Sequence, residues 1–116
     1  MQLRDVSPTG SAPQQPISVQ LTTLDAFFAE IGTDPSLVKI DVEGAEFAVL
    51  RGSDRIVRGP ARVLCELHPY AWPAAGHTGA DLQRWVEQRG RRLVWLDGGE
   101  PVHEFRYGVT ELVPIT

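Results

Sequence analysis

The chain has 116 residues, which is enough for one compact domain with an apolar core and too few for two. Hydrophobic residues make up 42% and charged residues 22%, so the composition excludes disordered, collagen-like and disulfide-rich proteins but favours no particular chemistry. The formal net charge of −4 argues against nucleic-acid binding, because proteins that neutralise phosphates carry a basic surface.

The single cysteine indicates a reducing compartment. Cys65 lies within an apolar run, where a buried thiol behaves as a small hydrophobic side chain, and it has no second cysteine to pair with. We therefore expect a cytoplasmic location. No apolar stretch approaches the ~20 residues of a membrane span, and the first residues lack the apolar segment of a signal peptide, so we expect no membrane contact.

The amino-terminal part should contain a flexible arm followed by a strand and a helix. Residues 1–16 are rich in Pro, Ser and Gln and offer little to bury, whereas the folded domain should occupy residues 17–116. Alternating polarity predicts a short strand over residues 17–21. Apolar residues at helical spacing then predict a helix from Leu24 to Ile31, for which Thr22 and Asp25 resemble a capping box.

The middle of the chain alternates strands with helices. The segments 37–42 and 62–67 are rich in β-branched and apolar residues and should be strands. Between them, residues 45–51 should form a helix that breaks or kinks at Gly52 and Ser53. The prolines after the second strand predict a loop over residues 68–79.

The carboxy-terminal part should hold one helix and three strands. Thr78 and Asp81 form a second capping pattern, and the helix they begin should stop at Gly90. The segments that should be strands are 92–96, 102–107 and 109–115, the first two as a hairpin. This order predicts an α/β fold with a mostly parallel sheet and antiparallel edge strands.

Polar residues at the carboxyl ends of the two central strands are the candidate site, since ligands of open α/β sheets bind there. Lys39 and Asp41 share one face of the first strand, where a central parallel strand is normally apolar. They either pair structurally or serve a function, and for Asp41 we favour function. Glu43 follows in the turn, where it could act in the site or cap the next helix.

The second strand contributes Glu66 and His68, which also share a face. If the two strands are neighbours, Asp41, Glu66 and His68 converge as a general base or as a weak site for a metal with oxygen and nitrogen ligands. No spacing in the chain matches a strong metal motif, and one cysteine excludes a thiolate zinc site, so we predict no metal.

Four segments, in this order and spacing, resemble the FkbM-type methyltransferases over about residues 18–96. They are Thr23-Leu24-Asp25, Lys39-Ile40-Asp41-Val42-Glu43-Gly44-Ala45-Glu46, Val49-Leu50-Arg51-Gly52 and Glu66-Leu67-His68-Pro69. The resemblance implies a Rossmann-like class I methyltransferase fold and the cofactor S-adenosylmethionine. It also implies O-methylation of a small molecule with a hydroxyl group.

By this resemblance the chain supplies the fourth strand of that fold onward. Lys39, Asp41 and Glu43 would then lie near the cofactor, and Asp41, Glu66 or His68 would deprotonate the acceptor. None of the eleven glycines forms the glycine-rich cofactor turn, so we expect a truncated fold, the carboxy-terminal half of the domain.

Two other functions are compatible with the sequence. A truncated sheet has an open edge, which could pair with a partner chain or a second copy in a non-catalytic interaction module. A small metal-dependent hydrolase using Asp41, Glu43, Glu66 and His68 is the second alternative, and divalent metal should then raise its melting temperature.

Overall fold

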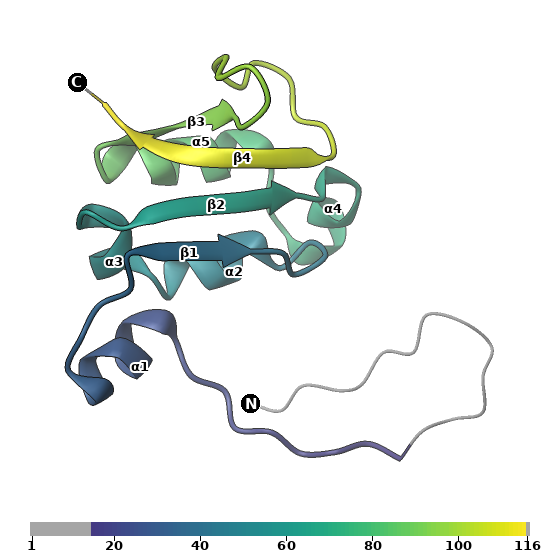
Figure 1. The fold of residues 1–116 in the computed structure, drawn as a ribbon. Coiled ribbons are helices and arrows are strands. Elements are labelled where there is room, and N and C mark those ends of the chain that lie inside the picture. Colours follow the sequence, from purple (N-terminus) through teal and green to yellow (C-terminus); the bar gives the residue numbers. More distant parts are fainter. Residues whose placement is uncertain (1–14, 116) are drawn as a thin grey trace.

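The computed structural model describes residues 15–115, and Figure 1 shows their arrangement. The expected flexible arm lies outside the described residues except for its last two, Gln15 and Pro16. The strand expected over residues 17–21 was wrong. This segment is extended, but it pairs with no strand among the described residues, and Ile17 is 67% exposed. Alternating polarity alone does not create a strand where the ladder hydrogen bonds have no partner.

A four-stranded sheet forms the centre of the molecule, in the order β1-β2-β4-β3. The strands are β1 (Leu37–Ile40), β2 (Arg62–Leu67), β3 (Arg91–Trp95) and β4 (Gly108–Pro114). β1 and β2 are parallel, whereas β4 runs antiparallel to both of its neighbours, β2 and β3. The mostly parallel sheet that we expected was therefore wrong. The connection from β3 to β4 contains no helix, and such a return produces an antiparallel pair.

The helices agree closely with the sequence-based expectation. They are α1 (Leu24–Ile31), α2 (Glu46–Arg51), α3 (Asp54–Arg58), α4 (Trp72–Ala75) and α5 (Gly79–Gln88), with a 3₁₀ turn η1 (Pro69–Ala71). The predicted break separates α2 from α3. The expected loop over residues 68–79 instead contains η1 and α4, because prolines are compatible with the first positions of a helix. None of these helices within residues 15–115 is long and apolar enough to cross a membrane.

Side-chain capping fixes two of the helix starts. The Thr78–Asp81 capping box is present at α5. At α1 the cap is Thr23 rather than the expected Thr22, and its hydroxyl accepts from the Ala26 N–H at 3.0 Å. Asp25 has a different role, because its carboxylate accepts from two backbone N–H groups in the first turn of α3.

The core lies between one face of the sheet and the helices α2, α3 and α5, which stand behind the sheet in Figure 1. On β2 the alternation is regular: Val63, Cys65 and Leu67 are buried, whereas Leu64 and Glu66 point to the other face. Burial of Cys65 agrees with its expected role as a small apolar side chain, and burial raises the pKa of its thiol.

The other face of the sheet carries no helix in the described part of the chain. Lys39 pairs in register with Leu64, and Glu66 with Val109, so these side chains form rows across the open face. β1 is an edge strand rather than the buried central strand we expected. The charges of Lys39 and Asp41 therefore meet water at little cost, and no burial penalty has to be offset.

The segment between β3 and β4 is a loop and not the expected strand over residues 102–107. It makes a single bridge to β3, between Val94 and Pro101, and Val102 then inserts into the core. The predicted hairpin was wrong because proline has no N–H with which to extend the ladder beyond this one bridge, whereas β4 forms a full ladder on the other edge of β3.

Candidate functional site

Three polar side chains meet at the carboxyl edge of β1 and β2. The side chains of Asp41, Glu66 and His68 each place one ligand-type atom within 4.8 Å of the other two. Nε2 of His68 lies 3.4 Å from Oε2 of Glu66 and 3.6 Å from Oδ1 of Asp41. We call these residues the carboxylate–histidine cluster. The convergence predicted from the sequence is present because β1 and β2 are parallel neighbours.

His68 is the buried member of this cluster. Its side chain is 4% exposed, whereas that of Asp41 is 48% exposed. The Nδ1 side of the ring faces Oε1 of Glu46 at 3.3 Å, without the geometry of a hydrogen bond. Nε2, on the opposite side, makes no hydrogen bond with the described residues and faces the two cluster carboxylates. The imidazole thus lies between carboxylates on both sides.

Glu46 is a site residue that the sequence interpretation missed. Its side chain is fully buried, and Oε1 accepts from the backbone N–H of His68 at 2.7 Å and from Nε1 of Trp72 at 3.4 Å. Oε2 accepts from the backbone N–H of Gly44. One carboxylate therefore ties the turn after β1 to the segment after β2.

A sequence signal for Glu46 did exist. Glu46, Phe47 and Leu50 are the buried residues of α2, so the glutamate lies on the same helix face as the apolar side chains. Its place in the first turn of the helix predicts only a favourable interaction with the helix dipole. A charged residue on an apolar helix face is a candidate for a buried, hydrogen-bonded role.

The turn that follows β1 has unusual backbone geometry. Glu43 has φ of 51° and Gly44 has φ of 100°, and the Ala45 N–H donates to the Val42 carbonyl at 3.2 Å. Positive φ at both central positions is the pattern of a primed turn, and it is strained for glutamate. α2 has no side-chain cap, so Glu43 does not cap it. Its carboxylate instead accepts from the Tyr70 hydroxyl at 3.0 Å, which raises the pKa of Tyr70.

The cluster perturbs the ionisation of its members and neighbours. A proton shared with Asp41 raises the pKa of Glu66, and partial burial acts in the same direction. The Tyr107 hydroxyl donates to Oε1 of Glu66 at 3.3 Å, and the charge of Glu66 raises the pKa of Tyr107. Glu66 therefore holds a proton at higher pH than an ordinary glutamate does.

Lys39 lies apart from the cluster. It is exposed on the open face, in the row behind Asp41, and its amino group makes no ion pair with any residue in the range 15–115. Of the residues expected near the cofactor, Asp41 and Glu43 are at the carboxyl edge, whereas Lys39 is set back from it.

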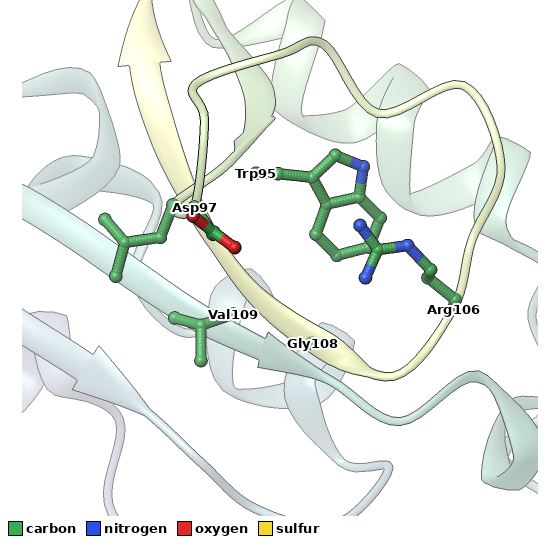
Figure 2. A pocket seen from close by; sticks show the side chains of 6 residues that line it. Trp95, Asp97, Arg106, Gly108 and Val109 are labelled. Carbon is green, nitrogen blue, oxygen red and sulfur yellow. The ribbon is translucent and has the colours of Figure 1, made fainter.

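A pocket lies where the end of β3, the start of β4 and the loop between them meet (Figure 2). Its volume is about 380 Å³, and it is lined by Trp95, Leu96, Asp97, Arg106, Gly108 and Val109. The guanidinium of Arg106 stacks on the Trp95 ring with its central carbon 3.9 Å from the ring centroid. Val109 is the register partner of Glu66, and Tyr107 follows Arg106 directly, so the pocket and the cluster share one edge of the sheet.

The fold and the site together define an α/β protein with acidic and imidazole groups at the carboxyl edge of its parallel strands. The model of the family described as methyltransferase FkbM domain matches residues 3–93. The chain belongs to this family, which confirms the resemblance noted from the four segments, and its four-stranded sheet is consistent with a methyltransferase-like fold. Comparison with curated proteins and with solved structures found no match.

Proposed function

We propose that this chain forms the carboxy-terminal half of an S-adenosylmethionine-dependent O-methyltransferase domain, with the carboxylate–histidine cluster at the acceptor site. The observation that carries the proposal is the convergence of Asp41, Glu66 and His68 at the carboxyl edge of two parallel strands, where α/β folds bind ligands. Membership of a methyltransferase family supplies the reaction class.

The donor set at this edge fits one end of the cofactor. S-adenosylmethionine has an ammonium group and supplies, when bound, a methyl group on a sulfonium sulfur that passes to the acceptor oxygen. Asp41 and Glu43 present exposed carboxylates suited to the ammonium group, and Lys39 is the cation nearest to them on β1. No glycine-rich turn follows a parallel strand within residues 15–115, so these residues hold the methionine end and not the nucleoside.

The cluster would remove the proton of the acceptor hydroxyl. Glu66 is the best base by its raised pKa, since efficient proton transfer needs a pKa nearer to the working pH. His68 would lie beside the acceptor oxygen with Nε2 facing Glu66 and Asp41, while its own position is fixed by the bond from its backbone N–H to Glu46. The pocket beside Val109 would receive a small molecule with a hydroxyl group.

Nuclear magnetic resonance (NMR) titration with millimolar S-adenosylmethionine tests the location of the site. We expect the backbone amide shifts to change at Asp41 to Gly44 and around His68. Asp41→Asn should reduce these changes, whereas Glu87→Gln, an exposed substitution on the opposite side of the sheet, should not. Transfer of labelled methyl to hydroxyl acceptors at the same cofactor concentration should fall with Asp41→Asn. Shift changes confined to other parts of the chain would contradict the proposal.

A second candidate function is an interaction module that pairs through the edge of β1. β1 has a free edge among the described residues, Leu37 at its start is 53% exposed, and one sheet face carries no helix in this part of the chain. Sedimentation analysis separates the candidates, because a module that pairs with its own copies forms dimers that Leu37→Lys weakens. A strict monomer at high concentration would argue against self-pairing.

A further inference from the structure

We propose that the carboxylate–histidine cluster binds one divalent cation, with Oδ1 of Asp41, Oε2 of Glu66 and Nε2 of His68 as its three protein ligands. The inference rests on the geometry of these side chains. It deepens the proposed function, since a hydroxyl bound to the cation would lose its proton more readily, but the binding itself does not require methyl transfer.

The first argument is the way the buried imidazole is aimed. The His68 side chain is more than nine-tenths buried, its Nε2 makes no hydrogen bond within residues 15–115, and it points at two carboxylate oxygens. A buried imidazole whose nitrogen faces two carboxylate oxygens, with no hydrogen bond to either, has the donor atoms and the orientation of a metal-ligand set.

The second argument is the environment of Nδ1. The Glu46 carboxylate lies 3.3 Å from Nδ1 and is fully buried, so in the tautomer that carries its proton on Nδ1 this proton faces a carboxylate. The lone pair of Nε2 then faces Glu66 and Asp41, which offer only acceptor oxygens when ionised. Acceptors that face one another repel unless a proton or a cation lies between them, and a divalent cation can bind all three at once. A carboxylate behind a metal-binding histidine is also the usual arrangement that orients such a ring.

The third argument is the spacing. Ligands at ~2.1 Å from an octahedral cation are separated by about 3.0 Å when they are adjacent. The two distances from Nε2 are 3.4 and 3.6 Å, and all three ligand atoms lie within 4.8 Å of one another, so rotation of the half-exposed Asp41 side chain can bring them closer to this spacing. Asp41 is half exposed, which leaves the remaining coordination positions open to water or to a hydroxyl group. One nitrogen and two carboxylate oxygens suit Mn²⁺ and similar first-row cations.

Binding of Mn²⁺ to the 116-residue chain tests the proposal. We expect one equivalent to bind saturably by calorimetry, to raise the melting temperature with concentration, and to broaden the NMR signals of the His68 ring before those of His103. Glu66→Gln and Asp41→Asn should each lower the Mn²⁺ affinity at least tenfold, whereas Glu104→Gln, an exposed acidic control, should leave it unchanged.

Two results would overturn the inference. One is the absence of saturable Mn²⁺ binding at millimolar concentration in a chain whose amide spectrum shows it to be folded. The other is binding that Glu66→Gln and Asp41→Asn leave intact. Failure of the proposed function gives a different result. Methyl transfer that a chelator does not affect would contradict the cation site and leave the methyltransferase proposal standing. Mn²⁺ binding without any response to S-adenosylmethionine would contradict the methyltransferase proposal and leave the cation site standing.

Discussion

The Glu46 carboxylate joins the two segments that carry the site residues. It accepts from the N–H groups of Gly44 and His68 and from the Trp72 indole, and all of these contacts are buried. Removal of a buried acceptor leaves its donors without a partner, and such donors are more costly than the bond itself contributes. Asp41 and His68 therefore owe their relative positions to a residue that faces away from solvent.

Glu46→Ala should lower the free energy of unfolding by about 3 kcal/mol, because it leaves several buried donors without an acceptor. Glu46→Gln should cost less, since the amide oxygen can still accept from the His68 N–H. The matched control is Glu87→Ala, at an exposed position of α5, which should change stability by no more than about 0.5 kcal/mol. Urea unfolding followed by tryptophan fluorescence measures the free energy of unfolding of the three variants. Equal losses of stability in Glu46→Ala and Glu87→Ala would contradict the role of Glu46.

Glu66 should give the stability of the fold a distinct pH dependence. Its folded-state pKa is raised by Asp41, so protonated Glu66 favours folding. This contribution is fully present below the unfolded pKa and is lost as pH rises through the folded one. Glu66→Gln mimics the protonated form, so the variant should gain stability relative to the parent chain as pH rises from about 4 to 7.

Urea unfolding across that pH range provides the measurement. Other carboxylates with shifted pKa, such as Asp54 and Glu111, are present in both proteins and cancel in the difference. In the Asp41→Asn background the pH dependence should largely disappear, because the neighbour that raises the pKa of Glu66 has lost its charge. If the difference in the free energy of unfolding between the parent chain and Glu66→Gln stays constant with pH, the carboxylates of Glu66 and Asp41 do not interact.

The turn between β1 and α2 is the element that brings the site together. Gly44 has φ of 100°, and a Cβ there would overlap the Cβ of Ala71 in η1. The glycine is thus required for two reasons, backbone conformation and close approach of the two segments. A side chain would push the segment after β2 away from the turn and disturb the bonds to Glu46.

Gly44→Ala should destabilise the chain more than Gly32→Ala does, and this pair separates the two reasons. Gly32 also has positive φ, 78°, but a Cβ there meets nothing within 4 Å, so its substitution costs only the conformational strain of ~1–2 kcal/mol. The excess cost at Gly44 reports the collision with Ala71. Thermal unfolding of both variants measures the difference, and equal melting temperatures would mean that the segments separate without cost.

The elements that could be predicted from the sequence are those whose signals are local. The helices at Leu24 and Thr78 have capping side chains and apolar spacing, and both begin where expected. The cluster could be predicted because residue parity and the order of β1 and β2 place Asp41, Glu66 and His68 at one edge. The features that the sequence did not predict depend on partners distant in sequence. They are the pairing of β4 with both β2 and β3, and the role of Glu46 as a buried hydrogen-bond acceptor.

On the scale of the whole molecule, helices cover one face of the sheet in the described part of the chain, and the other face has no helix. Helices α2, α3 and α5 cover the back of the sheet in Figure 1, whereas the front exposes rows that mix apolar and charged side chains. The candidate site lies where this open face meets the carboxyl edge. Within residues 15–115 the site is therefore bordered by the ends of β1 and β2 and by β4, and no helix covers it on the open face.

This one-sided site sets the expected strength of cofactor binding. A ligand as large as S-adenosylmethionine must be enclosed over most of its surface to offset the entropy lost on binding. The described residues offer carboxylates for its methionine end and no enclosed space for adenine and ribose. We therefore expect the 116-residue chain to bind S-adenosylmethionine with a dissociation constant of about 1 mM or weaker, which corresponds to about −4 kcal/mol.

Calorimetry with the purified chain measures this affinity, and S-adenosylhomocysteine serves as the matched ligand. S-adenosylhomocysteine lacks the methyl group and the positive charge on sulfur, so a site built mainly of carboxylates should prefer S-adenosylmethionine, and Asp41→Asn should reduce that preference. A pocket that held the nucleoside would instead bind both ligands alike and tightly. A micromolar dissociation constant, about −8 kcal/mol, would therefore mean that the chain encloses the cofactor fully, and the open face would have to close around it.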